Sequence, residues 1–348
     1  MIQISKRSIR SINILVGIRC LSNSYRLLNS RININGNSTS LGIDKTVEHN
    51  IKSETNRLSK TNSRFWDKGN VYYNPKTEKY EIQLDGKTLR TPLGFPLELP
   101  KNKKQLAYLI AHEWTNLPNI SVKSSTLPLT NLASRVIDLE NKDKSDNIEK
   151  KENMLALEEV KLNMLRYLDT DTCLIFAQHR DCDGKLRKRQ DEIHKPLIEE
   201  FNEFFTKWGH KQNLIKKDEE IRLNYLDCET DGLRGNKQGE KTQQVVLDWL
   251  DHLPIFDIIA LEKTIFTTKS FLCGITLLRS NSITHKEIYQ FNKSTPDEYY
   301  YKSLQELVEL GNLETILQTD QWGEVEDTHD VDKHDWLRNL ASAALLCH

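Results

Sequence analysis

The feature that most constrains the fold is a change of periodicity near residue 100. Before it, short apolar stretches at Val71–Tyr73 and Tyr80–Leu84 are separated by a polar turn. Asp85–Gly86 is a tight-turn dipeptide, and Lys87–Thr91 follows as a third strand. After it, apolar residues recur three and four positions apart over helix-length segments. Strands first and helices afterwards predict an α+β protein.

The first predicted helix begins after Asn102, a candidate N-cap, and ends before Pro118. Leu106, Ile110 and Trp114 share one face of it, which gives Trp114 a structural role in packing. Further helices are expected at about 131–139, 155–168, 184–207, 241–251, 254–269, 298–310 and 333–346, with a short extended piece at 172–177.

Two domains are expected from this order. A β-rich N-terminal domain with one helix occupies residues 64–130, and a larger, mainly α-helical C-terminal domain occupies residues 131–348. Residues 140–153 are polar and charged and predict a solvated loop, and the glycine-containing stretch 211–240 predicts partly irregular structure.

The first 43 residues contain six basic and no acidic residues. Ile14, Ile18, Leu21, Tyr25 and Leu28 fall on one face of a helix within them. This amphipathic, arginine-rich composition is typical of a mitochondrial transit peptide, so residues 1–45 are interpreted as a transit peptide with a disordered lead. The mature protein is then expected in the mitochondrial matrix.

Charge and hydropathy disfavour two classes of partner. Beyond residue 43 the chain carries 43 basic against 50 acidic residues, and such an acidic body is a poor nucleic-acid binder because phosphate contacts need cationic clusters. No stretch approaches the roughly 20 apolar residues of a membrane span. The six cysteines form no CxxC pair, which argues against a zinc ribbon or a disulfide scaffold.

Several motifs of enzymes are absent or incomplete. The sequence has no phosphate-binding glycine loop of the GxxxxGK[ST] or GxGxxG type and no GxSxG nucleophile elbow. Cys173, His179 and Cys182 could ligate zinc, but a fourth ligand is missing, and a structural role is favoured. Asp169 and Asp171 could act as acid and base, but capping of backbone groups is favoured. No cofactor or metal is therefore expected.

An acidic stretch covers residues 311–332, which contain seven Asp or Glu and no Lys or Arg. Trp322 lies in its middle. A charge run is usually a solvated face. Acidic residues around an aromatic side chain also describe a surface that attracts a basic partner and anchors it through apolar contact. The residues alone support these two interpretations about equally.

Several segments in order resemble one family. They are RFW at 64–66, YEIQLDGKTLRTP at 80–92, AHEWTN at 111–116, LPLTNLASRVIDL at 127–139, LRYLDTDT at 165–172, LRKRQDEIHKPLIEEF at 186–201 and QWGEVEDTHDVD at 321–332. Together they resemble the assembly factors of the mitochondrial ATP synthase that chaperone the alpha subunit of its catalytic head. The resemblance implies a β-rich domain joined to a helical one, no catalysis and no cofactor.

The resemblance also implies a partner and a surface. A member of this family binds the unassembled alpha subunit and prevents its aggregation until beta subunit replaces it. Glu314 matches an acidic position that the family uses for function. The hypothesis is that Glu314, Trp322, Glu324, Glu326 and Asp327 contribute to the client-binding surface.

Two other functions remain as alternatives. His329–Asp330 is a dipeptide of metal-dependent phosphohydrolases, although such a site needs further ligands from other helices. A stable structural subunit of a larger complex is the other alternative. The metal content of the purified protein tests the first, and stoichiometry in the finished complex tests the second.

Overall fold

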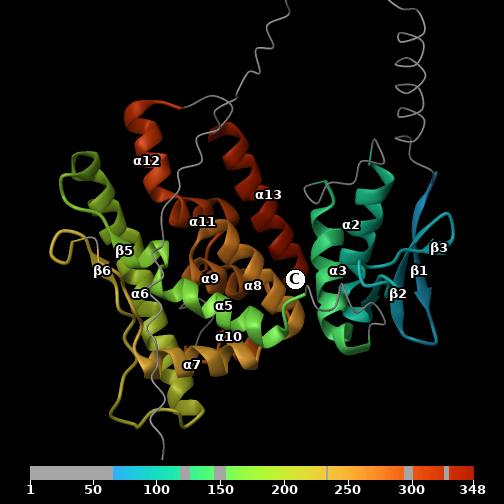
Figure 1. Ribbon diagram of the computed structural model, residues 1–348, viewed down its shortest axis with the longest axis horizontal. Coiled ribbons are helices and arrows are strands. Elements are labelled where there is room, and N and C mark those ends of the chain that lie inside the picture. Colours follow the sequence, from blue (N-terminus) through green and yellow to red (C-terminus); the bar gives the residue numbers. More distant parts are fainter. Residues whose placement is uncertain (1–65, 118–125, 145–153, 233, 294–300, 325–328) are drawn as a thin grey trace, which may run out of the picture. The chain divides into compact units, whose positions relative to one another are not determined.

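The computed structural model describes residues 66–117, 126–144, 154–232, 234–293, 301–324 and 329–348. The predicted transit peptide, Glu326 and Asp327 lie outside these ranges, and the side chains of His329 and Asp330 are not described either. Strands come first and the remainder is mainly helical, so the predicted α+β class is confirmed (Figure 1).

The N-terminal sheet is antiparallel, with β2 at its centre. β1 (Gly69–Asn74) pairs with one edge of β2 (Lys79–Leu84), while β3 (Lys87–Thr88) and β4 (Glu98–Pro100) also pair with β2. Asp85 and Gly86 connect β2 to β3 with positive φ angles of 47° and 80°. A two-residue hairpin turn of this kind needs both residues in the left-handed region, which explains the Asp-Gly pair. β3 is shorter than predicted.

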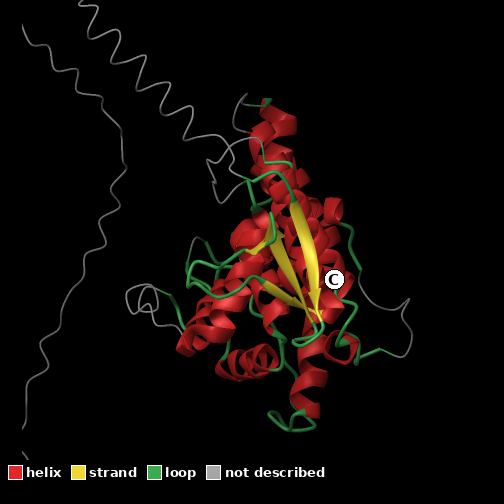
Figure 2. Cartoon of the chain, turned by 90° about the vertical axis from the view of Figure 1, so that its right-hand side faces the viewer, coloured by secondary structure: helices red, strands yellow, loops and turns green. Residues whose placement is uncertain are grey.

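Two helices complete this part of the chain. α2 (Lys104–Thr115) packs on the sheet and buries Leu106 and Ile110, and α3 (Pro128–Asn141) packs on α2. Figure 2 shows the strands in front of the helices. The prediction that Asn102 caps α2 is wrong, because a 3₁₀ turn at Lys101–Lys103 precedes the helix and no side chain caps it. α3 begins three residues earlier than predicted, with Pro128 in its first turn, where proline is tolerated.

The C-terminal part consists of helices joined by short connections. α8 and α9 lie at its centre and are buried around most of their circumference. A short parallel pair, β5 with β6, lies beside α6 (Figure 1). The bounds are α5 Leu157–Asp169, β5 Ile175–Phe176, α6 Lys185–Lys211, β6 Leu226–Asp227, α7 Glu240–Asp251, α8 Ile255–Thr268, α9 Phe271–Asn281, α10 Lys286–Tyr289, α11 Leu304–Gly311, α12 Leu313–Trp322 and α13 His329–Cys347, with 3₁₀ turns η2 Lys142–Lys144, η3 Thr172–Leu174 and η4 Asp181–Gly184.

Direct contacts join the strand region to the helical region. α3 packs against α8 and α13. The buried Lys103 donates hydrogen bonds from its ammonium to main-chain oxygen atoms of Leu346 at 2.9 Å and His348 at 2.7 Å. The predicted domain boundary between residues 130 and 131 falls inside α3, and that division of the chain stays a prediction.

Candidate functional surface

The residues predicted to bind a partner lie on and after α12. Leu313, at its first position, is buried against Cys182 and Leu186, which holds the start of the helix on the body. Glu314 is exposed, and its carboxylate accepts a hydrogen bond from the Gln318 side chain at 2.9 Å. Seating through Leu313 therefore turns Glu314 towards solvent at a fixed position.

At the other end of α12 the side chains are open to solvent. Trp322, the last residue of the helix, is 69% exposed, and Glu324 is exposed after it. A tryptophan offers a large apolar area, so leaving it in water is unfavourable unless a partner covers it. Trp322 thus differs from Trp66, Trp208 and Trp249, which are buried.

The turn η4 faces α12 and contributes two further acids. Cys182, Asp183 and Gly184 follow one another with φ of 50°, 54° and 80°, so the chain reverses tightly before α6. The Asp183 carboxylate accepts a hydrogen bond from the Gln321 side chain at 3.3 Å. This contact holds the turn against the last part of α12.

Three carboxylates therefore come together from distant parts of the sequence. Burial raises the pKa of the Cys182 thiol, and the charges of Glu314, Asp181 and Asp183 raise it further. The carboxylates of η4 and α12 thus lie close enough together to act on one thiol, and the charge of Lys185 partly opposes them. We call Asp181, Asp183 and Glu314 the acidic surface. Of these three residues only Glu314 could be predicted from the sequence, because no local pattern links it to residues about 130 positions earlier.

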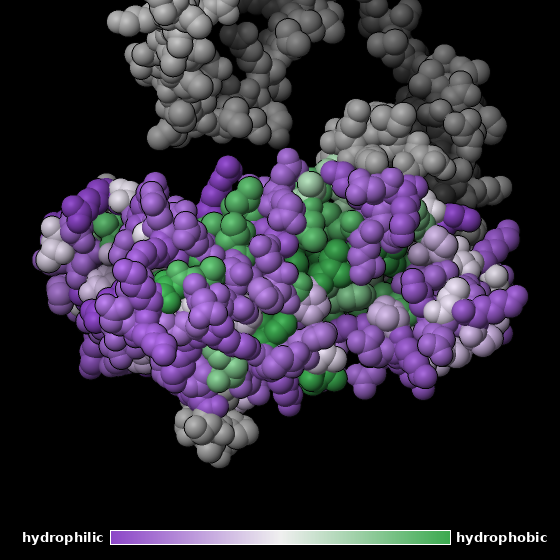
Figure 3. All heavy atoms as spheres, turned by 90° about the horizontal axis from the view of Figure 1, so that it is seen from below, coloured by the Kyte–Doolittle hydropathy of each residue, from purple (hydrophilic) through white to green (hydrophobic). Residues whose placement is uncertain are grey.

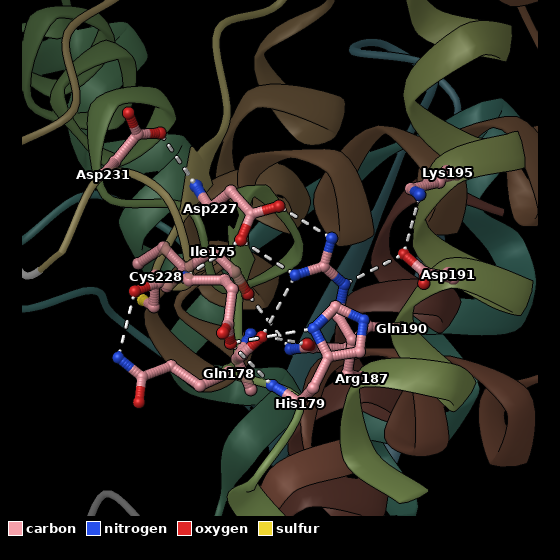
Figure 4. Close-up of polar contacts among 12 residues, drawn as sticks. Ile175, Gln178, His179, Arg187, Gln190, Asp191, Lys195, Asp227, Cys228 and Asp231 are labelled. Atoms are coloured by element: carbon pink, nitrogen blue, oxygen red, sulfur yellow. Dashed lines mark hydrogen bonds and ion pairs between the residues drawn. The ribbon is translucent and has the colours of Figure 1, made fainter. Parts of the chain in front are cut away.

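A buried polar network supports the segment that carries η4 (Figure 4). Arg187 on α6 donates two hydrogen bonds to the Asp227 carboxylate, at 2.8 and 2.7 Å, and a third to Asp191 at 3.2 Å. The Arg187 guanidinium holds the pKa of Asp227 below its usual value. Gln190 donates to the Ile175 carbonyl and accepts from the Ala177 amide. These bonds fix the chain between β5 and α6, on which the acidic surface depends.

A small cavity of about 280 Å³ adjoins Glu314. Gln190, His194, Lys269 and Trp336 are among the side chains that line it. His194 is buried, and its Nε2 donates to the Leu310 carbonyl at 3.0 Å, so this nitrogen carries a proton. The cavity is too small for most organic ligands, although a single side chain of a partner would fit.

The residues considered as zinc ligands make other contacts. Cys173 is fully buried with its Sγ 3.7 Å from Cys273 Sγ, whereas the exposed His179 faces Glu229 at 3.6 Å. Within the described ranges, no group of three or more His, Cys, Asp or Glu side chains is placed to hold a metal ion. No described helix is long and apolar enough to cross a membrane.

The carboxylates at 169 and 171 bond backbone amides, as the capping interpretation expects, although only Asp171 caps a helical turn, η3. Asp171 is fully buried and accepts hydrogen bonds from the amides of Cys173 at 2.8 Å and Leu272 at 2.9 Å. Asp169 accepts from the Gln238 amide at 2.8 Å. Both carboxylates are therefore used in joining segments of the fold.

Trp114 lies where α2, α3 and the segment before β1 meet. Its ring packs edge-on against Trp66 with centroids 5.3 Å apart, and its indole nitrogen donates to the Thr130 hydroxyl at 3.1 Å. The Trp66 indole in turn donates to the Trp114 carbonyl at 3.0 Å. These contacts agree with the packing role that its position in the sequence suggests.

Apolar side chains are also exposed away from α12. On the face shown in Figure 3, hydrophilic side chains cover most of the surface and apolar side chains gather in patches between them. Exposed large apolar residues in the described part of the chain include Tyr108, Leu155, Leu162, Phe266 and Ile283. A surface of this mixed kind suits recognition of a protein partner.

Comparisons of the sequence and of the fold with known proteins all lead to relatives named ATP12. Residues 63–202 match the family described as ATP12 chaperone protein. The chain is 39% identical to Protein ATP12, mitochondrial, of Saccharomyces cerevisiae over 311 residues, which cover 89% of this chain and 91% of the relative. It is 32% identical to Protein atp12, mitochondrial, of Schizosaccharomyces pombe, with 81% of each chain covered. The crystal structure of Atp12 from Paracoccus denitrificans superposes with a TM-score of 0.54 at 18% identity, covering 82% of this chain and 97% of that one.

Proposed function

Because this chain belongs to the ATP12 chaperone family, we propose that it assists assembly of the mitochondrial F-type ATP synthase by binding the unassembled alpha subunit of the catalytic head. It keeps the subunit from aggregating until beta subunit replaces it, and it acts in the matrix without catalysis. The observation that carries the proposal is the likeness to the yeast protein over nine-tenths of both chains. That relative and its fission-yeast counterpart are named as mitochondrial proteins.

The physical task explains why such a protein has a mixed surface. A lone subunit of a ring exposes an interface that is apolar and large, and such an area aggregates when it is open to water. A chaperone has to cover this area and still release it. Charges at the rim speed the encounter and set orientation, while a few aromatic anchors supply the affinity.

The acidic surface and Trp322 supply these two elements on neighbouring segments. Asp181, Asp183 and Glu314 supply negative charge. Trp322 supplies an exposed apolar ring at the other end of α12, the helix that carries Glu314. We infer that the client presents basic side chains to the acidic surface and an apolar patch to Trp322. Glu324 continues the acidic charge beyond the helix, and the same role is proposed for Glu326 and Asp327.

The experiment that tests the function follows one client from capture to release. The chain from residue 46 is mixed with alpha subunit diluted from denaturant, and light scattering reports aggregation. We expect the chain to suppress scattering at near-equimolar ratio and to leave the alpha subunit when beta subunit is added. Gel filtration separates the species formed. Persistent scattering, or a chain that stays in the assembled alpha–beta complex, would contradict the proposal.

A further inference from the structure

A second cavity lies where three helices of the fold meet. α3, α8 and α13 pack against one another in pairs. Between them is a space of about 300 Å³ lined by Asn131 of α3, Lys263 of α8, and Asp335, Arg338 and Asn339 of α13. It is separate from α12 and the acidic surface, since none of their residues lines it.

The charged groups of this cavity are mostly cationic. Arg338 pairs with Asp335 on the same helix, Nη2 to Oδ1, at 2.9 Å. Lys263 is half-buried, and its ammonium has no hydrogen bond or ion pair with any side chain in the described part of the chain. α3 contributes no charged residue to the lining. Two cations thus share one carboxylate, and that carboxylate is already bonded to Arg338.

Lys263 and Arg338 repel each other across this cavity, and the partial exposure of Arg338 and Asp335 reduces the repulsion without removing it. Burial lowers the pKa of Lys263, the Arg338 charge lowers it further, and Asp335 only partly opposes these effects. A desolvated ammonium beside a second cation is stabilised when an anion joins it. The nearby start of α3 does not offer a competing site, because Glu113 already accepts from the amides of Leu129 at 2.8 Å and Thr130 at 2.9 Å.

We propose that this cavity binds a compact oxyanion, a carboxylate or phosphate group, between Lys263 and Arg338, with the Asn339 amide as a further donor. An ammonium and a guanidinium are the side chains that bind such groups most strongly. The space is at the lower end of the range for ligand pockets, about 300 Å³, which suits one anionic group and excludes a nucleotide. This site rests on its own geometry and is independent of the proposed chaperone function.

The test uses inorganic phosphate and three forms of the chain: wild type, Lys263→Met and Lys188→Met. Lys188 is an exposed lysine of α6 that does not line the cavity. Isothermal titration calorimetry and thermal unfolding compare potassium phosphate with potassium chloride at equal ionic strength. We expect phosphate affinity to fall about ten-fold or more in Lys263→Met, as for loss of one charge-assisted hydrogen bond, and to stay unchanged in Lys188→Met.

Stability separates loss of the site from loss of the fold. In chloride, Lys263→Met should melt no lower than wild type, because the change removes a desolvated cation. In phosphate, only wild type and Lys188→Met should gain melting temperature beyond the general stabilising effect of phosphate salts. An equal gain in all three forms, or equal affinity in wild type and Lys263→Met, overturns the proposal.

A third measurement distinguishes the two sources of the anion. If the occupant is an acidic side chain of a bound protein, phosphate should compete with capture of the alpha subunit, and Lys263→Met should weaken that capture. If the occupant is a free anion, neither phosphate nor Lys263→Met should change capture of the alpha subunit. The phosphate titration should still depend on Lys263. Failure of the chain to capture the alpha subunit at all would concern the proposed function only.

Discussion

Arg135 of α3 and Glu262 of α8 form an ion pair with two hydrogen bonds, Nε to Oε2 and Nη2 to Oε1, each 2.7 Å long. The Glu262 side chain is 7% exposed and that of Arg135 is 34% exposed. The pair therefore joins the strand region to the helical region through a geometry that only arginine provides. Lys263, the next residue along the chain, has no such partner among the residues that the structure describes.

Removing only the cation of this pair should destabilise the protein. In Arg135→Ala the Glu262 carboxylate stays buried without its donor, and we expect a loss of about 2 kcal/mol, less than for a fully buried pair because Arg135 is partly exposed. Urea unfolding followed by far-UV circular dichroism measures it. The double variant Arg135→Met with Glu262→Met should recover most of the loss, and a double variant as unstable as the single one would contradict this account.

Glu200 occupies a more deeply buried position on α6. Its carboxylate accepts from Arg279 at 2.5 Å and from Lys293, and the Arg279 side chain is fully buried. The guanidinium also lies over the rings of Phe201 and Phe204. Glu200→Ala removes the carboxylate that Arg279 and Lys293 share, and we expect a loss of about 3–5 kcal/mol in the free energy of unfolding.

The matched control lies one turn further along the same helix. Glu203 pairs with Lys207 at the surface, where both side chains are nearly half exposed. Glu203→Ala should change the free energy of unfolding by less than about 1 kcal/mol, because exposed pairs contribute little. Similar losses for Glu200→Ala and Glu203→Ala in the same denaturant titration would show that burial does not set the difference.

Local patterns predicted the elements whose two faces differ. The strands β1 and β2, the Asp-Gly turn and the helices α2, α3, α5, α6 and α7 were all found near their observed positions, because alternation, turn dipeptides and apolar stripes act over short distances. α8 was also found, although it is largely buried, because Lys263 and Phe266–Thr267 leave part of it facing solvent and Pro254 marks its start. α9 was missed because nearly all its residues are buried, which leaves no polar face to give a period. α12 was missed for the opposite reason, since Leu313 is its one fully buried side chain.

The candidate surface shows the limit of the same reasoning. Glu314 and Trp322 were identified from the acidic stretch and the family resemblance. Asp181 and Asp183 were not, because their approach to α12 depends on the tight turn η4 and on the Arg187 network behind it. The approach of Lys263 on α8 to Arg338 on α13 is equally invisible in the sequence.

Asp171 should give the stability of the protein a distinct pH dependence. Burial raises its pKa from 3.8 to about 6, against hydrogen bonds from Ser270 and from backbone amides that lower it. The folded state then holds a proton that the unfolded state has released, so this group's contribution to stability is largest below about pH 4 and is lost as the pH rises through 6. The total lost is about 3 kcal/mol, at about 1.4 kcal/mol for each pKa unit.

A comparison with Asp171→Asn isolates this group from all other titrating residues. The variant is less stable overall, because one amide oxygen replaces two carboxylate oxygens that accept from Cys173 and Leu272. The difference in free energy of unfolding between wild type and variant should decrease as the pH rises from 4 to 7. Urea titrations at several pH values measure it, and a difference that is constant or grows would contradict the raised pKa.

Trp322 should matter for binding and not for folding. Its ring is mostly exposed, so Trp322→Ala should change the free energy of unfolding by less than about 0.5 kcal/mol. If Trp322 anchors the client, affinity for the alpha subunit should fall by about ten-fold or more, as for an aromatic hot spot. Biolayer interferometry with immobilised alpha subunit measures this loss. Unchanged affinity would assign Trp322 to a solvated face.

Charge reversal at Glu314 tests the electrostatic half of the same surface. Glu314→Lys places a cation beside Asp181 and Asp183, so a basic client meets less negative potential, and we expect association to slow by about ten-fold at low salt. The difference from wild type should shrink as salt screens the charges. Glu199→Lys makes the same change on the exposed side of α6, away from the acidic surface, and should bind as wild type does. Equal slowing of association in both variants would mean that net charge, and not the acidic surface, governs the encounter. A large drop in melting temperature for Glu314→Lys alone would mean that Glu314 has a structural role.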